Sequence, residues 1–265
     1  MSLPESERNA RYHTHIAPEY DARMAQHPGN SWVRDAFRQV VIETVPPGSL
    51  LLDFGCGTGM DSLWYAQQGY RVLAYDNAPG MMKELERQCA REIVAGQVVP
   101  LHADYDHFPE VLQRAARPDA VVSNFAALNH IQELRLLLSV LADHLDPPGY
   151  VIANVLNPLF WQDLIHPWWW VPLMRGIPAG YVSCVWKEVS SYRHFMGPIA
   201  RAARPRFVKV GQAGLGTFLR YESARYAWNE PRSLAERIDV RFCRSFPLRH
   251  FGKFIFLIFR RITFQ

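Results

Sequence analysis

Short apolar runs alternate with stretches of helical spacing between residues 50 and 155. Apolar runs of this length suit strands that are buried on both faces of a parallel sheet. We expect strands over 50–54, 70–75, 98–101, 120–124 and 150–155, and helices over 81–92 and 131–143. Another helical stretch follows the first strand and ends at Gly69. The alternation predicts a doubly wound α/β sheet with right-handed crossovers.

The segment before the first strand also has helical spacing. Residues 12–45 place apolar side chains such as Trp32, Phe37 and Val41 on one helical face. Pro46 ends this pattern, because proline lacks the N–H that a helix interior needs. We therefore expect N-terminal helices over 12–45.

Beyond residue 156 the alternation stops. Residues 157–205 are rich in proline and aromatic residues, and we interpret them as an insertion that covers the ligand-binding edge of the sheet. Residues 207–210 and 251–259 are predicted to be C-terminal strands. A membrane-binding tail is the rival interpretation of 251–259, but an apolar run followed by Arg260 and Arg261 is typical of a buried strand.

We predict one domain over residues 1–265. Its parts are N-terminal helices over 12–45, a core over 48–156, an insertion over 157–205 and C-terminal strands over 206–265. The composition is that of an ordinary globular protein, with 49% hydrophobic and 20% charged residues among 265.

The ends of the chain and the cysteines predict a cytoplasmic protein. The polar residues 1–11 lack the apolar core of a signal peptide. The apolar run 254–259 is far shorter than the ~20 residues that span a bilayer. The four cysteines are isolated, which predicts reduced thiols and no zinc site.

Charge is distributed unevenly along the chain, although the net charge is only +4. Residues 1–186 hold 13 Lys+Arg and 20 Asp+Glu, a balance of −7, whereas residues 187–265 hold 16 and 5, a balance of +11. A solvated basic face explains this excess, and so does an anionic partner: an acidic substrate, an acyl carrier or the surface of a membrane. No nucleic-acid-binding module accompanies the charge, so nucleic acid is disfavoured.

A glycine loop follows the first predicted strand. Gly55, Gly57 and Gly59 form a G-x-G-x-G pattern, whereas a dinucleotide fingerprint would read G-x-G-x-x-G. Asp53 stands two residues before the first glycine, where a negative charge would be badly placed beside a pyrophosphate. A carboxylate there could instead accept a hydrogen bond from an ammonium group.

An acidic residue stands at the end of the first predicted strand, and others follow the second and the third. These are Asp53, Asp76 and Asp104. Open α/β sheets bind ligands beyond the carboxyl ends of their strands, so these residues mark the expected site.

The residues 51–59 resemble the first motif of class I S-adenosylmethionine-dependent methyltransferases. The resemblance continues through 75–77, 103–104 and 147–150, and covers about residues 30–155. It implies a Rossmann-like, seven-stranded, mostly parallel sheet with N-terminal cap helices and an aromatic lid insertion. It also implies S-adenosylmethionine as the cofactor and methyl transfer as the activity.

The same resemblance implies a set of cofactor contacts. The glycine loop would contact the amino-acid part of the cofactor, Asp76 its ribose and Asp104 its adenine amino group, while Met81 would cover the adenine. Backbone contacts are implied near Asn124. The full set is Asp53, Gly55, Cys56, Gly57, Gly59, Asp76, Asn77, Met81, Asp104, Tyr105, Asn124 and Tyr20.

The acceptor side is less defined. His130 follows the fourth strand and could act as a general base, because the pKa of histidine lies near neutrality. A histidine held by a local hydrogen bond is the alternative. Asn129, Trp168 and Trp169 are candidate substrate contacts. Their aromatic surroundings favour an apolar or aromatic acceptor, although cation–π contact with an amine is left open.

The residues after the fourth strand narrow the class of enzyme. They read Ser123-Asn124-Phe125-Ala126, without the Asn/Asp-Pro-Pro-aromatic tetrad of enzymes that methylate nucleic-acid amines. No acidic cluster accompanies them, so we expect no metal. We predict a methyltransferase acting on a small molecule, with secondary metabolism as one setting. The rivals are an NAD(P)-dependent oxidoreductase and a non-catalytic binding protein of the same fold.

Overall fold

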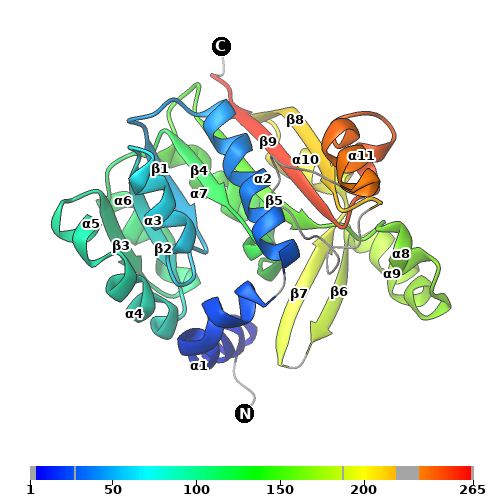
Figure 1. Ribbon diagram of the computed structural model, residues 1–265, viewed down its shortest axis with the longest axis horizontal. Helices are drawn as coiled ribbons and strands as arrows, with labels where there is room; N and C mark the ends of the chain where they lie inside the picture. The colour runs from blue at the N-terminus through cyan, green and yellow to red at the C-terminus, as the bar shows by residue number, and fades with distance from the viewer. Residues whose placement is uncertain (1–3, 27, 187, 219–232, 264–265) are drawn as a thin grey trace.

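The computed structural model describes residues 4–26, 28–186, 188–218 and 233–263. A seven-stranded sheet forms its centre, in the order β3-β2-β1-β4-β5-β9-β8 (Figure 1). The strand β9 runs antiparallel to both β5 and β8, whereas the other neighbours are parallel. The strands are β1 (Leu50–Phe54), β2 (Arg71–Asp76), β3 (Val98–His102), β4 (Ala120–Ser123), β5 (Tyr150–Leu156), β8 (Phe207–Leu215) and β9 (Phe254–Arg261). The predicted Rossmann-like, mostly parallel sheet is confirmed.

Helices cover both faces of this sheet. One face packs on α2 (Pro28–Thr44), α3 (Met60–Gln67), α4 (Pro79–Gln88) and α5 (Ala90–Val94). The other packs on α6 (Phe108–Arg114), α7 (Leu134–His144) and α10 (Met196–Ala203). The remaining helices are α1 (Glu5–Ala25), α8 (Trp161–Leu164), α9 (Pro167–Ala179), α11 (Leu234–Phe242) and the 3-10 turns η1 (Tyr105–His107), η2 (Ala127–His130) and η4 (Leu248–His250).

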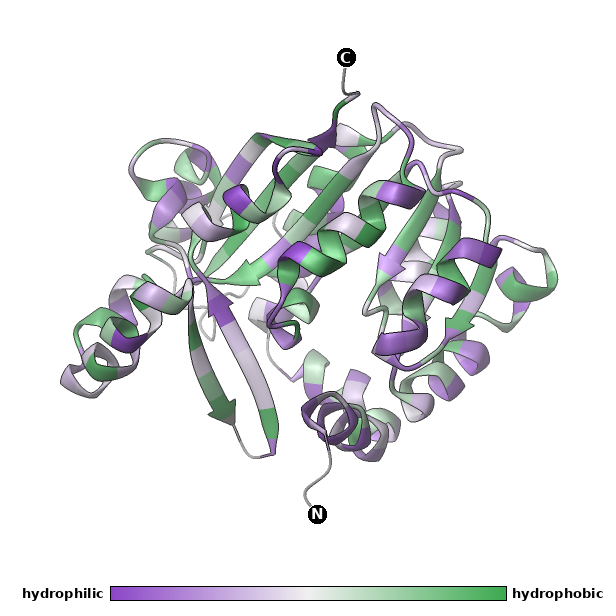
Figure 2. Cartoon of the chain, turned by 180° about the vertical axis from the view of Figure 1, so that it is seen from behind, coloured by the Kyte–Doolittle hydropathy of each residue, from purple (hydrophilic) through white to green (hydrophobic). Residues whose placement is uncertain are grey.

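The strands are buried on both faces, as their composition predicts. All five residues of β1 are buried, with Leu51 in the core on one face and Leu50 and Leu52 in the core on the other. Figure 2 shows the strands of the sheet as largely apolar ribbons, whereas polar segments lie on the outer sides of the helices. A buried parallel sheet fixes where its carboxyl ends meet, and this positions the site.

Some predicted boundaries differ from the structure. The N-terminal helical region begins at Glu5 rather than at residue 12, and helices α1 and α2 are the N-terminal helices that the sequence predicted. The helix expected over 81–92 is two helices, because Cys89 leaves helical geometry between α4 and α5. Helix α4 begins at Pro79, two residues earlier than predicted, because proline suits the first turn of a helix.

The segment 157–205 folds into three parts. Helices α8 and α9 form one, the hairpin of β6 (Tyr181–Trp186) and β7 (Val189–His194) forms the second, and α10 packs on α7 as the third. Strand β7 contacts α1 and η2, so the hairpin lies beside the carboxyl ends of the sheet, while α9 packs against β6 (Figure 1). No helix of the described residues is long and apolar enough to cross a membrane.

Candidate functional site

The glycine loop after β1 is held against β2. Gly55 and Cys56 both donate their backbone N–H to the carbonyl of Tyr75, at 2.8 and 3.0 Å. Gly55 has φ +76°, and a Cβ atom on it would lie 2.4 Å from the Cβ of Ala127. Gly57 has φ +55°, and a Cβ atom there would meet nothing within 4 Å. The loop therefore needs glycine for its conformation, and at Gly57 it presents bare backbone to open space.

A cavity of ≈ 400 Å³ lies at the carboxyl ends of β1, β2 and β4. Its size is typical of small-molecule sites, and α1 and the β6–β7 hairpin close its far side. Lining residues from the sheet side are Phe54, Gly55, Gly57, Tyr75, Asp76, Asn77, Met81, Tyr105, Asn124, Phe125 and Ala127. The other walls are Glu5, Ser6, Asn9, His13, Tyr20, His130, Ile131, Gln132, Glu133, Leu136 and Tyr192.

Asp76 is the acidic group of this cavity nearest to the glycine loop. Its Oδ2 accepts the N–H of Gly57 at 2.9 Å, and its Oδ1 accepts the N–H of Ala78 at 2.9 Å. Burial raises the pKa of Asp76, and the N–H groups of Ala78 and Gly57 offset part of that rise. The side chain thus fixes the loop while facing the cavity.

The predicted adenine end spans two neighbouring cavities. Asn77 and Tyr105 line both the first cavity and a second one of ≈ 620 Å³, and Asp104 lines only the second. Met81 is buried and packs beside Ala78 at the first cavity. Burial raises the pKa of Tyr105 to about 12, so its phenol is neutral near pH 7.

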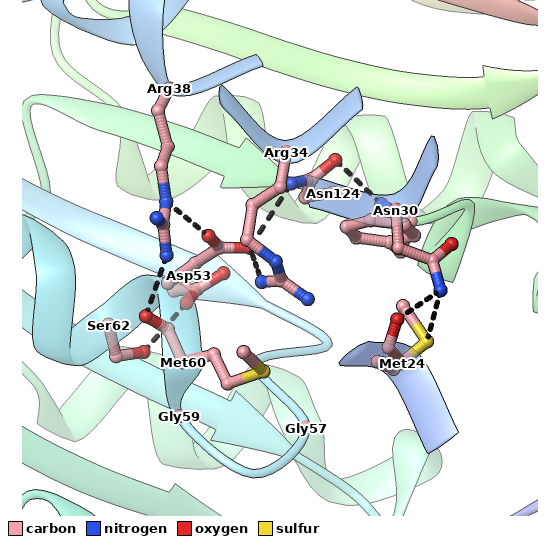
Figure 3. A network of polar contacts seen from close by, with 12 residues as sticks. Met24, Asn30, Arg34, Arg38, Asp53, Gly57, Gly59, Met60, Ser62 and Asn124 are labelled. Atoms are coloured by element: carbon pink, nitrogen blue, oxygen red, sulfur yellow. Dashed lines mark hydrogen bonds and ion pairs between the residues drawn. The ribbon is translucent and has the colours of Figure 1, made fainter. Parts of the chain in front are cut away.

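Three other predicted cofactor residues lie outside the cavity lining. Cys56 and Gly59 turn toward the core, where a Cβ atom on Gly59 would meet Leu85 at 2.9 Å. Asp53 lies behind the loop and accepts a hydrogen bond from Ser62 Oγ at 2.7 Å (Figure 3). Burial, and then the nearby charge of Asp61, raise the pKa of Asp53 to about 7. Any influence of Asp53 on a ligand in the cavity is therefore indirect in this conformation.

Two arginines of α2 connect that helix to the loop region. Arg34 pairs with Asp61 Oδ2 at 2.5 Å and Arg38 pairs with Asp61 Oδ1 at 2.8 Å. The amide of Asn124 donates to Asp61 at 3.1 Å, and Arg34 lies 4.5 Å from the ring centre of Phe125. Figure 3 shows Arg34 and Arg38 between α2 and the glycine loop. The pairing therefore orients Asn124 and Phe125, which both line the cavity.

The backbone after β4 is strained at the cavity. Phe125 and Ala126 adopt φ +48° and +62°, a region that side chains other than glycine rarely enter. The side-chain oxygen of Asn124 accepts the N–H of Phe125 at 2.8 Å, and Asn154 O accepts the N–H of Ala126 at 3.1 Å. Strain of this kind persists at functional sites where the surroundings hold it.

His130 is positioned by segments far apart in sequence. Its Nδ1 lies 3.0 Å from the Ser190 carbonyl of β7 and 3.3 Å from Asn9 Nδ2 of α1. Asn9 Nδ2 also donates to the Ser190 carbonyl at 3.0 Å, and Asn9 Oδ1 accepts the N–H of Ser190 at 3.0 Å. His13 of α1 lies edge-on to His130, with ring centres 5.4 Å apart. Sequence reasoning identified His130 but not this support.

The predicted substrate contacts lie away from the cavity lining. The side-chain amide of Asn129 is hydrogen-bonded to backbone groups. It donates to Tyr192 O at 2.6 Å and accepts from Leu156 N at 2.9 Å. Trp169 is buried and donates to Pro158 O at 3.0 Å, whereas Trp168 is 64% exposed on α9. The hairpin side chain that reaches the cavity is Tyr192, which donates its hydroxyl to Glu5.

Several cavity residues were missed from sequence. Glu5 and Asn9 lie on the early turns of α1, before the segment that was predicted to be helical, and His13 lies one turn later, just inside that segment. Their i, i+4 spacing was the available signal, since Glu5, Asn9 and His13 share one helical face. Arg34 and Arg38 also repeat at four residues, on the face of α2 that is otherwise apolar. The described residues contain no group of His, Cys, Asp or Glu that could hold a metal ion.

Comparison with known proteins assigns the chain to a family. A methyltransferase-domain family matches residues 30–182, more than half of the chain, and the chain belongs to this family. Among curated relatives, a malonyl-[acyl-carrier protein] O-methyltransferase of Serratia marcescens is 47% identical over 155 residues, 56% of this chain. A ubiquinone biosynthesis O-methyltransferase of Xylella fastidiosa is 24% identical over 197 residues, 74% of this chain. The matches span 54% and 72% of those two proteins, so the chain covers about half of the first relative.

Solved structures share the fold. The 1,6-didemethyltoxoflavin-N1-methyltransferase of Burkholderia thailandensis has a TM-score of 0.59 at 14% identity, covering 99% of this chain and 92% of that one. A methyltransferase of Streptomyces caelestis has a TM-score of 0.57 at 14% identity, covering 94% and 96%. These likenesses show the class I methyltransferase fold, and the family match makes the protein a methyltransferase, with S-adenosylmethionine as its cofactor. The bare backbone at Gly57, the carboxylate of Asp76 and the buried Met81 around one cavity fit that cofactor.

Proposed function

We propose that the protein transfers the methyl group of S-adenosylmethionine to a hydroxyl oxygen of a small, uncharged and mainly apolar acceptor, with His130 as the general base. The observation that carries this proposal is the contact of 3.0 Å between His130 Nδ1 and the Ser190 carbonyl, at a histidine that lines the cavity. When bound, the cofactor supplies an electrophilic methyl group. The chain's own residues bind, orient and accept the proton.

The hydrogen bonds of His130 support one tautomer. A carbonyl oxygen only accepts, so the ring nitrogen facing Ser190 O carries the proton. Asn9 Nδ2 donates to the same carbonyl at 3.0 Å and lies farther, at 3.3 Å, from Nδ1. We therefore assign the proton of neutral His130 to Nδ1, which leaves the lone pair on Nε2 to accept a proton from the acceptor.

The electrostatics of His130 support a neutral base at physiological pH. Burial lowers the pKa of His130, the neighbouring His13 lowers it further, and the Ser190 carbonyl opposes the change in part. The net direction is downward from the ordinary value of 6.5. The imidazole is therefore unprotonated at neutral pH, as a general base must be.

The walls of the cavity support an acceptor without negative charge. None of its described lining residues is lysine or arginine, whereas Glu5, Asp76 and Glu133 are acidic. Ile131 and Leu136 add apolar surface on the side away from the glycine loop. A carboxylate would find no counter-charge on these walls, while a neutral hydroxyl compound would bury apolar area there.

The proposed step balances with these groups alone. The acceptor hydroxyl gives its proton to His130 Nε2 while its oxygen forms a bond to the methyl carbon. The bond from that carbon to sulfur breaks, and its electron pair stays on sulfur. Alignment of the two reactants supplies much of the rate gain in such a displacement. We assign Asp76 to the ribose hydroxyls, Asp104 and Tyr105 to the adenine edge, and Tyr20 and Asn124 to the amino-acid end.

The experiment is His130→Gln in the full chain, assayed for methyl transfer against a panel of neutral phenols and alcohols. We expect kcat to fall by about 10²–10⁴-fold, the range for loss of a general base, with the Kd for S-adenosylmethionine nearly unchanged. In the parent protein, kcat/KM should fall as pH drops, with a midpoint below 6.5, and the variant should lose this limb. His144→Gln, on α7 and outside the cavity lining, is the matched control.

Two outcomes would contradict this role. Full activity in the glutamine variant would remove His130 from the chemistry. An equal loss of cofactor binding and activity would make it a structural residue of the cavity. Turnover of amines with no hydroxyl methylation would change the acceptor class without changing the family.

A second candidate acceptor is a carboxyl group on an acyl chain carried by a protein. The balance of +11 over residues 187–265 favours it, because carrier proteins that are acidic would bind a basic surface. The names of two relatives, both malonyl-[acyl-carrier protein] O-methyltransferases, point the same way. Methylation of a malonyl-loaded carrier protein that stops when salt is raised would favour this candidate over a free hydroxyl compound.

A further inference from the structure

Helices α8 and α9 form an arm that projects beyond the edge of the main sheet (Figure 1). Trp169, Leu173 and Gly176 of α9 are buried, and Trp169 and Leu173 pack on Val182 of β6. These three buried residues occupy one side of the helix. The arm is thus anchored on one side and open on the other.

The open side of α9 is apolar. Met174 is 60% exposed, and Figure 2 shows apolar segments on this projecting part of the chain. At 3.6 residues per turn, the exposed apolar positions span about half of the helix circumference. The exposed large apolar residues of α9 are Trp168, Trp170, Val171, Met174 and Ile177, and Ile165 precedes them.

Charge is nearly absent from the arm. Between residues 164 and 186 the only charged side chain is Arg175, which is exposed. Asp163, just before this stretch, is paired with Arg193 at 2.6 Å. The exposed face of a helix in water normally carries several charged side chains, whereas this face of α9 carries only Arg175.

Helix α11 lies next to the arm, and it buries its two acidic residues, Glu236 and Asp239. Trp161 of α8 donates its ring N–H to Thr217 O at 2.5 Å, and Thr217 N donates to Asp239 of α11 at 3.0 Å. Helix α11 exposes Arg237 and Arg241. The arm and α11 are therefore linked through Thr217 (Figure 1), and together they offer the exposed apolar side chains of α9 and the exposed arginines of α11 as a candidate surface.

We propose that this surface docks on a lipid bilayer that contains anionic lipids, with α9 lying in the interface. The apolar side chains radiate over a broad, convex side of a projecting helix, so a fluid apolar phase can cover them all, whereas a protein partner would need a groove around the helix. Tryptophan is enriched at the level of lipid headgroups, and Trp168 and Trp170 supply it here. The exposed Arg237 and Arg241 complement anionic headgroups, which attract basic side chains near a membrane surface.

The test is co-sedimentation of the full chain with vesicles of phosphatidylcholine, with and without phosphatidylglycerol. We expect binding to the anionic vesicles and a loss of about tenfold or more in the partition coefficient for Met174→Glu/Ile177→Glu, because carboxylates oppose burial in the interface. Arg237→Glu/Arg241→Glu should weaken binding to anionic vesicles and leave the weak binding to neutral ones unchanged. Val94→Glu, at a residue of α5 that is 91% exposed, is the matched control.

Four results would overturn the proposal. The first is that the parent protein does not bind anionic vesicles. The second is that the α9 variant binds them as well as the parent does, and the third is that the Val94→Glu control loses as much binding as the α9 variant. The fourth is a dimer or a carrier-protein complex that the α9 variant abolishes while vesicle binding persists. Unchanged thermal melting and binding of S-adenosylmethionine confirm that each variant is folded.

Discussion

At the scale of single residues, Asp53 is a buried carboxyl group near the glycine loop whose pKa is strongly raised. It is buried beneath the loop, with Ser62 Oγ as its hydrogen-bond donor. Burial and the neighbouring Asp61 raise its pKa to about 7, far above the 3.8 of an ordinary aspartate. Folding therefore favours the protonated form of this side chain, and the loop is less stable whenever Asp53 is ionised.

This shift predicts how Asp53→Asn changes stability with pH. The folded protein keeps a proton between about pH 4 and pH 7 that the unfolded chain has lost, so the free energy of unfolding falls as pH rises through that window. Asparagine at this position does not ionise, so the free energy of unfolding of the variant does not fall in this way. We expect almost no gain near pH 4 and a gain on the order of 4 kcal/mol at pH 8, about 8 °C in Tm. Thermal melts of both proteins from pH 4 to 8 measure it, with the exposed Asp106→Asn as control. A gain that is constant across pH would refute the assignment.

At the scale of elements, Asn9 connects α1 to the β6–β7 hairpin across the cavity. Its amide exchanges two hydrogen bonds of 3.0 Å with the backbone of Ser190. The same Ser190 carbonyl faces His130. The contact that holds α1 to the β6–β7 hairpin therefore also orients the proposed base.

The variant pair Asn9→Asp and Asn9→Ala separates orientation from charge. A carboxylate about 3 Å from His130 Nδ1 raises the pKa of a histidine, by about 1 unit or more at this range. The acid limb of kcat/KM should therefore move to higher pH in the aspartate variant. The alanine variant should lower kcat while the limb stays in place. Steady-state rates from pH 5 to 9 measure both. If the two variants shift the limb equally, Asn9 acts only through the fold.

The sequence pattern predicted the elements that bury regular faces. Buried strands and helices with one apolar face carry a local signal, so the sheet and α2, α3 and α7 were found. Helix α1 buries only Asn9 and Ala17 within the main part of the molecule, which leaves almost no periodicity to read. The β6–β7 hairpin lies in the aromatic-rich segment, where its alternation of apolar and polar residues was not recognised as a strand pattern. Boundaries were therefore best in the core and worst at the cavity walls.

The candidate site divides in the same way. Gly57, Asp76 and Met81 were predicted from short motifs and their neighbours in sequence, and all three line the cavity. His130 is held by Ser190 and Asn9, which lie 60 and 121 positions away in the sequence, and no local pattern predicts such contacts. Trp169 was expected to contact substrate, yet consecutive positions on a helix point in different directions, and it is used in the packing of the arm.

At the scale of the whole molecule, one buried network joins the N-terminal helices to the sheet. Asp61 of α3 pairs with Arg34 and Arg38 of α2 and accepts from Asn124, whose side-chain oxygen accepts from Asn154 of β5. Burial alone would raise the pKa of Asp61, but the two arginines lower it below the ordinary value. The network thus spans the layer of α2, the glycine loop and the central strands.

Asp61→Asn should destabilise the whole protein, because it leaves two arginines largely buried without a charge partner. Breaking a buried ion pair from one side costs about 3–5 kcal/mol, or about 10 °C in Tm for a chain of this size. The folded pKa of Asp61 is depressed, so the stabilisation is present above the unfolded value of about 4 and is lost as pH falls through the folded value. The Tm difference between the two proteins should therefore be large at pH 7 and shrink below pH 4. Glu84→Gln, which breaks an exposed i, i+3 pair with Arg87, should change Tm by less than about 2 °C at either pH. An equally small effect of Asp61→Asn would mean that Asn124 and water compensate the arginines, and that α2 is held to the sheet by its apolar face alone.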